Sequence, residues 1–431
     1  MVAELRQVKL SDVQFNPDIY PRKAHDPALV QKYAGCLEQI EERSHFMAVA
    51  EDLELLDGRH RHLAYLTVDP DQSRTVSVLV YPVTASADKF RLAVKLNSEH
   101  GHQLSTDDKK RCVLDGYTKF GMTVEEIAKE ASVRKAVALE WTSAIRQAEQ
   151  DRENEAIFDL WMACYTQEQI AEQTGVPQQT VARKLGELPT KFPGTNRVKL
   201  SEYGDEDWAR PLFDIWNADR NANKVKHFGN TPVEFVDNLL YLYTEPFDIV
   251  IDPFAGGGST IDVCQKRLRR YWVSDRKPIT ARENEIRKHD LATDGLSGPS
   301  RWADVALVYL DPPYWKQAAG KYSTDETDLA NMPLEKFTET LVGIIHGYGA
   351  KLKPGAHIAC IISPTQWPNE DKRTVYHDLD LARLVGKNLR LKQRILCPYS
   401  SQQYNGTQVD IAKEQKLLMA LSRTMLVWER E

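Results

Sequence analysis

An acid, two prolines and an aromatic residue stand together in the run Asp311-Pro312-Pro313-Tyr314. The run follows an apolar segment, residues 305–310, which predicts a buried parallel strand. In open α/β sheets ligands bind where the strands end, so this run is expected at a binding edge. The prolines lack backbone donors but keep their carbonyls as acceptors, and the tyrosine offers a ring that can cover a planar base. Such a group suits chemistry on the exocyclic amine of an extruded nucleobase, whereas a turn capped by an aspartate is the purely structural alternative.

A glycine-rich turn lies upstream of this run. The apolar residues 247–251 are followed by the segment Asp252-Pro253-Phe254-Ala255-Gly256-Gly257-Gly258-Ser259-Thr260. Glycines let the backbone approach a ligand closely, and a helix is predicted to begin near Ser259. The segment lacks the Gly-Lys-Ser/Thr ending of a P-loop, and its consecutive glycines do not fit the dinucleotide fingerprint. An acid at the head of this turn, with Asp-Pro-Pro-Tyr on a later strand, is a far more specific signal than either segment alone.

Together the two segments resemble motifs of the amino-methylating DNA methyltransferases that use S-adenosylmethionine. Phe254, Gly256 and Gly258 occupy the aromatic-x-Gly-x-Gly positions of that family, and residues 311–314 match its catalytic motif. The resemblance covers residues 210–431 and implies a Rossmann-like α/β domain with a mostly parallel seven-stranded sheet. It implies catalysis by Asp311, Pro312, Pro313 and Tyr314, with no metal. It implies S-adenosylmethionine binding by Asn230, Thr231, Pro232, Asp252, Phe254, Ala255, Gly256, Gly258, Ser259, Thr260, Asp275 and Asp290.

Three of these assignments rest on the neighbouring segments. Asp275 ends a predicted strand, where the family binds the ribose hydroxyls. Asp290 follows the next predicted strand, where in the family an acid contacts the adenine amino group of the cofactor. Asp294 competes for this role. Residues 227–232 resemble the motif that closes over the methionine end of the cofactor.

The base that this site would modify is predicted from one residue. Family members that act on cytosine usually carry serine where Asp311 stands, so the resemblance favours adenine N6 over cytosine N4. No cysteine neighbours the motif, which argues against chemistry on carbon 5 of cytosine. An alternative of another class is a non-enzymatic partition or transcription protein whose methyltransferase half is vestigial.

The N-terminal half predicts a way to find DNA. Residues 1–100 resemble the small α+β ParB/sulfiredoxin-like domain, in which a Gly-x-Arg-Arg segment forms a phosphate-binding turn. Here Asp57-Gly58-Arg59 opens that segment, but His60 separates Arg59 from Arg61, so a scaffold without a nucleotide is the favoured interpretation.

Two helix-turn-helix patterns follow within the all-α region predicted for residues 101–190. The first runs from Met122 to Trp141 and lacks a glycine in its turn, so the alternative is that it only packs within the domain. The second runs from Tyr165 to Leu185 and is the stronger candidate for major-groove binding. The residues predicted to contact DNA are Gln178, Gln179, Thr180, Arg183 and Lys184. Residues 191–209 are predicted to be a linker, and residues 316–331 a mobile loop over the DNA-side cleft.

Composition agrees with a cytoplasmic, prokaryotic or phage-encoded enzyme that acts on double-stranded DNA. The chain has 431 residues, a net charge of −6 and six scattered cysteines, which fit reduced thiols. No run of 18 apolar residues is present, so no membrane partner is expected. Basic clusters such as residues 266–270 suit a local DNA footprint or a solvated face. A homodimer and a partner nuclease remain open.

Overall fold

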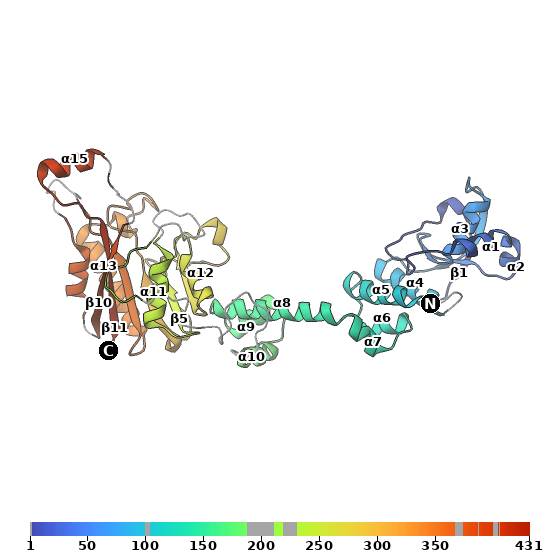
Figure 1. Ribbon diagram of the computed structural model, residues 1–431, viewed down its shortest axis with the longest axis horizontal. Helices are drawn as coiled ribbons and strands as arrows, with labels where there is room; N and C mark the ends of the chain where they lie inside the picture. The colour runs from blue at the N-terminus through green and yellow to red at the C-terminus, as the bar shows by residue number, and fades with distance from the viewer. Residues whose placement is uncertain are drawn as a thin grey trace. The chain divides into compact units, whose positions relative to one another are not determined.

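The computed structural model describes residues 2–99, 104–187, 211–218, 231–366, 374–386, 388–399, 404 and 406–431. The chain divides into two compact units, Met1–Gln150 and Asp151–Glu431, and Figure 1 labels many of their helices and strands. The predicted linker and the predicted cofactor residue Asn230 lie outside the described residues. Within the described ranges, no helix combines the length and apolar character needed to cross a membrane.

The N-terminal unit is built on a four-stranded mixed sheet with the strand order β1-β4-β2-β3. Strand β4 is antiparallel to β1 and parallel to β2, and β2 is antiparallel to β3. The small α+β fold predicted for this region is therefore present. Its strands are β1 (Glu4–Lys9), β2 (Met47–Ala50), β3 (Leu55–Asp57) and β4 (Thr75–Tyr81). Its helices are α1 (Pro27–Ala34), α2 (Leu37–Glu42), α3 (Arg59–Val68), α4 (Ser86–Glu99), α5 (Thr106–Thr118), α6 (Val124–Glu130) and α7 (Lys135–Trp141).

The two faces of this small sheet carry separate apolar clusters. On one face Val76, Val78 and Val80 of β4 alternate inward against α1 and α3. On the other face the helices α4 to α7 pack together with the sheet around residues such as Phe90 and Ile127. The helical region after the sheet is thus part of one core with it rather than an appended arm.

The C-terminal unit contains a seven-stranded sheet with the order β10-β11-β9-β8-β5-β6-β7. Strand β11 is antiparallel to β10 and β9, and the remaining described pairs are parallel. The α/β fold class and the mostly parallel seven-stranded sheet are confirmed. The strands are β5 (Ile249–Asp252), β6 (Arg270–Asp275), β7 (Arg287–Lys288), β8 (Val305–Leu310), β9 (His357–Ile362), β10 (Leu389–Pro398) and β11 (Ser422–Arg430). The helices are α9 (Gln167–Thr174), α10 (Gln178–Gly186), α11 (Val233–Tyr243), α12 (Ser259–Lys266), α13 (Leu334–Lys351), α14 (His377–Leu384) and α15 (Gly406–Gln415).

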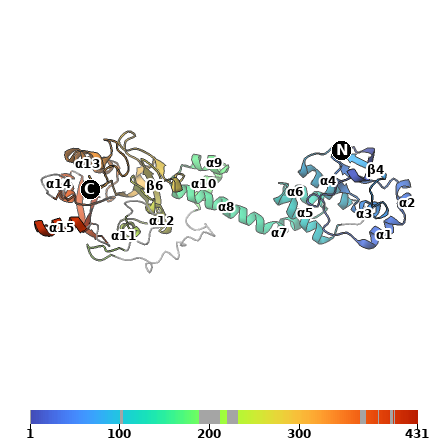
Figure 2. The same ribbon diagram turned by 90° about the horizontal axis from the view of Figure 1, so that it is seen from above.

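Helices cover both faces of the large sheet, with α11 and α12 on one side and α13 on the other (Figure 2). The strands serve both layers because successive side chains point to opposite faces. Val250 packs with α11 and α12, whereas Ile249 and Ile251 pack with α13. The central strands are accordingly buried along their whole length, which explains their continuous apolar sequences. One more helix, α8 (Ser143–Met162), begins in the N-terminal unit and ends in the C-terminal unit.

Candidate cofactor and catalytic site

The glycine-rich turn is held in place from below by Asp252, the last residue of β5. Its buried carboxylate accepts hydrogen bonds from the Thr260 hydroxyl at 2.6 Å and from the Phe254 amide at 3.0 Å. Burial raises the pKa of Asp252 to about 7. Gly256 and Gly258 have φ of 51° and 74°, in the left-handed region that favours glycine, and α12 begins directly after them. Asp252 therefore shapes the turn from within the core.

The next strand end supplies a carboxylate that faces the same turn. Asp275, the last residue of β6, accepts hydrogen bonds from the Gly256 amide at 3.0 Å and from the Lys277 amide at 2.8 Å. These two contacts fix the carboxylate beside the turn. They leave acceptor capacity on both oxygens, because each carboxylate oxygen can accept more than one hydrogen bond.

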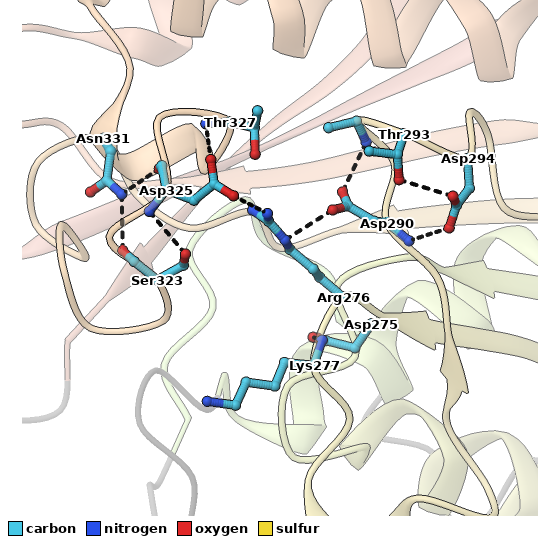
Figure 3. Close-up of polar contacts among 11 residues, drawn as sticks. Asp275, Arg276, Lys277, Asp290, Thr293, Asp294, Ser323, Asp325, Thr327 and Asn331 are labelled. Atoms are coloured by element: carbon cyan, nitrogen blue, oxygen red, sulfur yellow. Dashed lines mark hydrogen bonds and ion pairs between the residues drawn. The ribbon is translucent and has the colours of Figure 1, made fainter.

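Asp290 stands beyond the end of β7 and lies opposite Arg276 (Figure 3). The Arg276 guanidinium contacts the Asp290 carboxylate at 2.9 Å and the Asp325 carboxylate at 2.6 Å. Asp294, the competing acid, turns back and accepts the Asp290 amide at 3.0 Å and the Thr293 hydroxyl at 2.9 Å. These hydrogen bonds lower the pKa of Asp294, which is thereby engaged in its own turn.

A cavity of about 570 Å³ opens above these strand ends. Of the predicted cofactor residues, Phe254, Gly256, Asp275 and Asp290 line it, and the catalytic residues Asp311 and Pro313 close it on one side. The other described residues predicted to bind the cofactor are not among those that line the cavity: Thr231, Pro232, Asp252, Ala255, Gly258, Ser259 and Thr260.

The loop after the catalytic motif forms another wall of this cavity. Tyr322, Thr327 and other residues of segment 321–332 line it, and Asp325 is tied to Arg276. Within the loop, the Asn331 side-chain amide donates to the backbone carbonyls of Ser323 at 2.9 Å and Asp325 at 2.8 Å (Figure 3). The sequence predicted a mobile loop over the DNA-side cleft, and the structure places segment 321–332 in the wall of the cavity that Asp275, Asp290 and Asp311 also line.

Asp311 follows β8 and is enclosed by hydroxyl groups. One carboxylate oxygen, Oδ1, accepts the Tyr314 hydroxyl at 3.0 Å, and the other, Oδ2, accepts the Thr231 hydroxyl at 2.5 Å. Burial raises the pKa of Asp311, and these hydrogen bonds oppose the rise. Thr231 was predicted to contact the cofactor, but here it contacts the catalytic acid. Pro312 is buried under the turn.

One residue at this site was missed by sequence reasoning. Arg423, at the start of β11, is 5% exposed, and its Nη1 donates to the Thr231 hydroxyl at 2.8 Å. Its guanidinium lies over the Phe235 and Tyr399 rings, at 5.5 and 5.1 Å from their centroids. A local signal for such a role is a cation two residues before the apolar run 425–428 of this strand.

The second helix-turn-helix pattern forms as predicted, with α9 and α10 joined by Gly175 at a φ of 70°. Gln178, Gln179 and Arg183 are exposed on α10, and Thr180 is half-buried. Lys184 departs from its predicted role in phosphate binding. It is buried, and its ammonium contacts two side chains of α8, the Glu153 carboxylate and the Asn154 side-chain oxygen Oδ1, the latter at 2.6 Å. The lysine thus fastens α10 to α8.

The same module is anchored on the edge of the large sheet. The guanidinium of Arg270 from β6 lies 4.6 Å from the Trp161 ring centroid and donates to the Trp161 carbonyl. Arg287 from β7 donates to the Ala163 carbonyl and lies over Trp272 at 4.0 Å. Two cations thereby donate to carbonyls at the C-terminal end of α8, where the helix dipole favours positive charge.

The basic cluster at residues 266–270 is therefore structural in large part, instead of a DNA footprint. Arg267 is buried and forms an ion pair with Asp237 at 2.6 Å. Arg269 is also buried and donates to the Thr244 hydroxyl and carbonyl. Sequence alone could not distinguish these roles, because clustered arginines suit a buried seam and a phosphate backbone equally well.

The turn predicted to resemble a phosphate-binding segment is likewise engaged internally. Arg61 donates to the carbonyls of His45 and Phe46 and pairs with Asp57 at 3.0 Å. The Arg59 guanidinium lies 3.6 Å from the Phe15 ring centroid. Both arginines thus stabilise the N-terminal unit itself.

Comparison with known proteins agrees with the α/β fold and with a cavity at the carboxyl ends of its strands. A profile of the N6/N4 DNA methylase family, described as DNA methylase, matches residues 110–280, a range that includes the glycine turn and ends before Asp311. The chain is similar to that family, whose members are S-adenosylmethionine-dependent methyltransferases.

Two curated relatives match a shorter stretch. The type II methyltransferase M.XycI of Xanthomonas campestris pv. cyanopsidis is 37% identical over 70 residues, 16% of this chain and 23% of that protein. The type II methyltransferase M.Cfr9I of Citrobacter freundii is 32% identical over 72 residues, 17% of this chain and 24% of that protein. The chain thus spans about a quarter of the length of the curated relatives it matches.

A solved structure is similar to another part of the chain. The C-terminally truncated chromosome-partitioning protein ParB from Caulobacter crescentus, complexed to the centromeric parS site, is 15% identical with a TM-score of 0.23. The match covers 41% of this chain and 82% of that one.

Proposed function

We propose that this protein is a DNA methyltransferase that transfers a methyl group from S-adenosylmethionine to the N6 amino group of adenine. The observation that carries the proposal is a shared cavity. Asp311 and Pro313 line the same space as the glycine turn and the acids Asp275 and Asp290. A base acceptor and a cofactor-type pocket therefore meet at one sheet edge, as expected for ligand sites of α/β folds.

The cavity residues fit the cofactor by shape and by donor set. The Gly256 backbone can approach a ligand closely, and Asp275 and Asp290 offer carboxylates to ribose hydroxyls and an adenine amine. Phe254 adds an apolar wall, and Tyr322 of the loop closes the opposite side. When bound, S-adenosylmethionine supplies an electrophilic methyl group on a sulfonium.

The catalytic residues act by positioning and by electrostatics. The Asp311 carboxylate and the free proline carbonyls accept the hydrogens of the target amine and raise the electron density on its nitrogen. S-adenosylmethionine held beside Gly256, Asp275 and Asp290 would supply the methyl group, and the amine nitrogen that accepts it would become cationic. A carboxylate beside it stabilises that charge most in the transition state, and the extra proton then leaves the nitrogen. Tyr314 stacks on the extruded base, and its hydroxyl holds Asp311 until the base enters.

Double-stranded DNA is the proposed macromolecular substrate, and α10 is its proposed reader. Gln178 and Gln179 are exposed and suit base edges, as does Arg183. The cytosine-N4 reaction is the second candidate, because the same acceptors can bind either exocyclic amine. An acid at position 311, where serine is usual for cytosine, is the observation that favours adenine.

Methyl transfer from labelled S-adenosylmethionine to DNA tests the reaction, and mass spectrometry of the nucleosides tests the base. We expect N6-methyladenine from the wild-type protein and a loss of roughly 10²–10³ in turnover for Asp311→Ala, with cofactor affinity changed only a few-fold. Asp294→Ala is the matched control, because that acid lies outside the cavity. N4-methylcytosine alone would overturn the base assignment, and methyl transfer by Asp311→Ala at the wild-type rate would overturn the catalytic one.

A second arm tests the cofactor assignment by calorimetry. Asp275→Ala should weaken S-adenosylmethionine binding by ten-fold or more, about the contribution of a charge-assisted hydrogen bond. The Asp294→Ala control should bind as the wild type does. Equal affinities for both variants would remove Asp275 from the cofactor site.

A further inference from the structure

Arg423 is a buried cation with an unusual position. It is 5% exposed, stands at the start of β11 and lies between the rings of Phe235 and Tyr399. Its Nε has no hydrogen-bond partner among the described residues. A buried charge of this kind costs free energy unless an opposite charge or a strong acceptor lies near it.

A directed chain of hydrogen bonds connects this cation to the catalytic acid. Arg423 Nη1 donates to the Thr231 hydroxyl at 2.8 Å, and that hydroxyl donates to Asp311 Oδ2 at 2.5 Å. Because the hydroxyl accepts from the arginine, its single hydrogen is directed to the carboxylate. The polarity of the chain is thereby fixed from β11 through the segment before α11 to the end of β8.

We infer that Arg423 is a positioning residue, which acts through Thr231 to keep Asp311 ionised and to reserve Oδ1 for the substrate amine. The inference rests on the proposed function for the identity of that amine. Oδ2 accepts the Thr231 hydroxyl at 2.5 Å and the Tyr309 hydroxyl at 3.5 Å, whereas Oδ1 accepts the Tyr314 hydroxyl at 3.0 Å. Oδ1 therefore has more acceptor capacity left for the amine, which replaces or joins the Tyr314 hydroxyl there. Replacement of this hydroxyl by the amine frees the Tyr314 ring to move over the base.

The groups that face Asp311 come from every neighbouring element, and they differ in their effect on its charge. Burial raises the pKa of Asp311, whereas Arg423 and the hydroxyls of Thr231, Tyr314 and Tyr309 lower it. The other titratable groups near it are Asp252 of β5, Tyr322 of the loop, Cys360 of β9 and Cys397 of β10. Arg423 is the cation among the neighbours that act on Asp311 within the described chain.

The first test measures thermal unfolding against pH and does not depend on activity. Arg423→Met leaves the Asp311 carboxylate buried without its cation, so its folded pKa rises further above the unfolded value. The stability it contributes is then present at acid pH and lost as the pH rises through the folded pKa. The midpoint of Arg423→Met should therefore fall further below wild type at pH 8 than at pH 5.

A second substitution separates this effect from a simple packing defect. In the Arg423→Met background, Asp311→Asn removes the uncompensated charge and should recover most of the loss at pH 8. In the wild-type background the same Asp311→Asn change should give no recovery. A loss that is equal at both pH values, or that Asp311→Asn does not relieve, would overturn the inference even if the protein methylates DNA as proposed.

The second test follows methyl transfer against pH. The acid limb of the turnover profile should move upward by about one pH unit or more in Arg423→Met, with KM for S-adenosylmethionine changed little. Arg423→Lys keeps the cation and should retain the wild-type limb. An unshifted limb in Arg423→Met would overturn the inference. If the wild-type protein transfers no methyl group to any DNA, the proposed function fails, and the unfolding test still decides whether Arg423 controls the charge of Asp311.

Discussion

The two helix-turn-helix segments begin alike and are used differently. Each opens with a threonine whose hydroxyl caps the first helix, and Glu126 or Gln169 completes a capping box. The turns then differ, because the second passes through Gly175 at a φ of 70°, whereas the first places Ser132 at 51°. A serine in this conformation is strained where a glycine is not, so the first turn depends more on its packing.

The partners of the two apolar faces separate the segments further. Helices α6 and α7 bury Ile127 and Ala138 in the core that also contains α4 and α5. Helices α9 and α10 form a small cluster with α8, whose end docks on the large sheet through Phe158 and Met162. The motif is thus specified by capping and apolar spacing, while its role depends on which surface its apolar side meets.

Truncation should give the largest effect. A fragment that starts at Ser143 keeps α8, and we expect it to fold and to bind S-adenosylmethionine. A fragment that starts near Asp205 loses Phe158 and Met162 from the core and exposes the sheet edge. Loss of two large buried side chains costs on the order of 4–8 kcal/mol, comparable to the stability of many domains. Circular dichroism melts and calorimetry with the cofactor check this, and equal stability of the two fragments would contradict the docking.

The anchoring arginine should give the next largest effect. Arg287→Ala removes a cation from the end of α8 and from the Trp272 ring, which should lower unfolding stability by about 2–3 kcal/mol. Arg301→Ala is the matched control, because its side chain is 79% exposed. Chemical denaturation measures both variants. A loss no greater than that of the control would show that the second segment is not held through Arg287.

Substitutions at two adjacent residues of α10 should separate an effect on stability from an effect on DNA binding. Lys184→Met removes the contacts of the ammonium with Glu153 and Asn154. It should destabilise the C-terminal unit by about 1–2 kcal/mol, with little effect on the salt dependence of DNA binding. Arg183→Ala should leave stability unchanged, since its pair with Glu187 is exposed, and should weaken DNA binding by about 1–3 kcal/mol if it reads a base edge. Melting curves and salt titrations of binding distinguish them. The opposite pattern would restore Lys184 as a phosphate contact.

The sequence predicted those large features of the fold that a local sequence pattern marks. The apolar runs before Asp252 and Asp311 identified central parallel strands, and the glycine turn identified the ligand edge. These features follow from short-range periodicity and turn chemistry, which a single sequence contains.

Features that depend on distant residues could not be predicted in this way. Arg423 donates a hydrogen bond to Thr231, which is 192 positions away in the chain. No local sequence pattern predicts such a contact. Lys184 and Arg287 likewise look like surface cations until the surface that buries them is known. The place of the 316–331 loop over a DNA-side cleft stays a prediction, but the ion pair that holds the loop joins Arg276 to Asp325, 49 positions apart, and no local pattern indicates it.

The smallest expected effect concerns the first helix-turn-helix segment. Lys135, the first residue of α7, is exposed and pairs with Glu125 at 2.8 Å. Lys135→Ala removes only this surface pair, which contributes less than about 1 kcal/mol. Because α6 and α7 belong to a core with α4 and α5, we expect Lys135→Ala to leave methylated sites unchanged and to alter DNA affinity by no more than about two-fold. Sequencing of methylated DNA beside Arg183→Ala measures the contrast, and Glu125→Ala controls for the broken pair. Relaxed site choice in Lys135→Ala, comparable to that of Arg183→Ala, would mean that the first segment also reads sequence and that burial in a shared core does not preclude it.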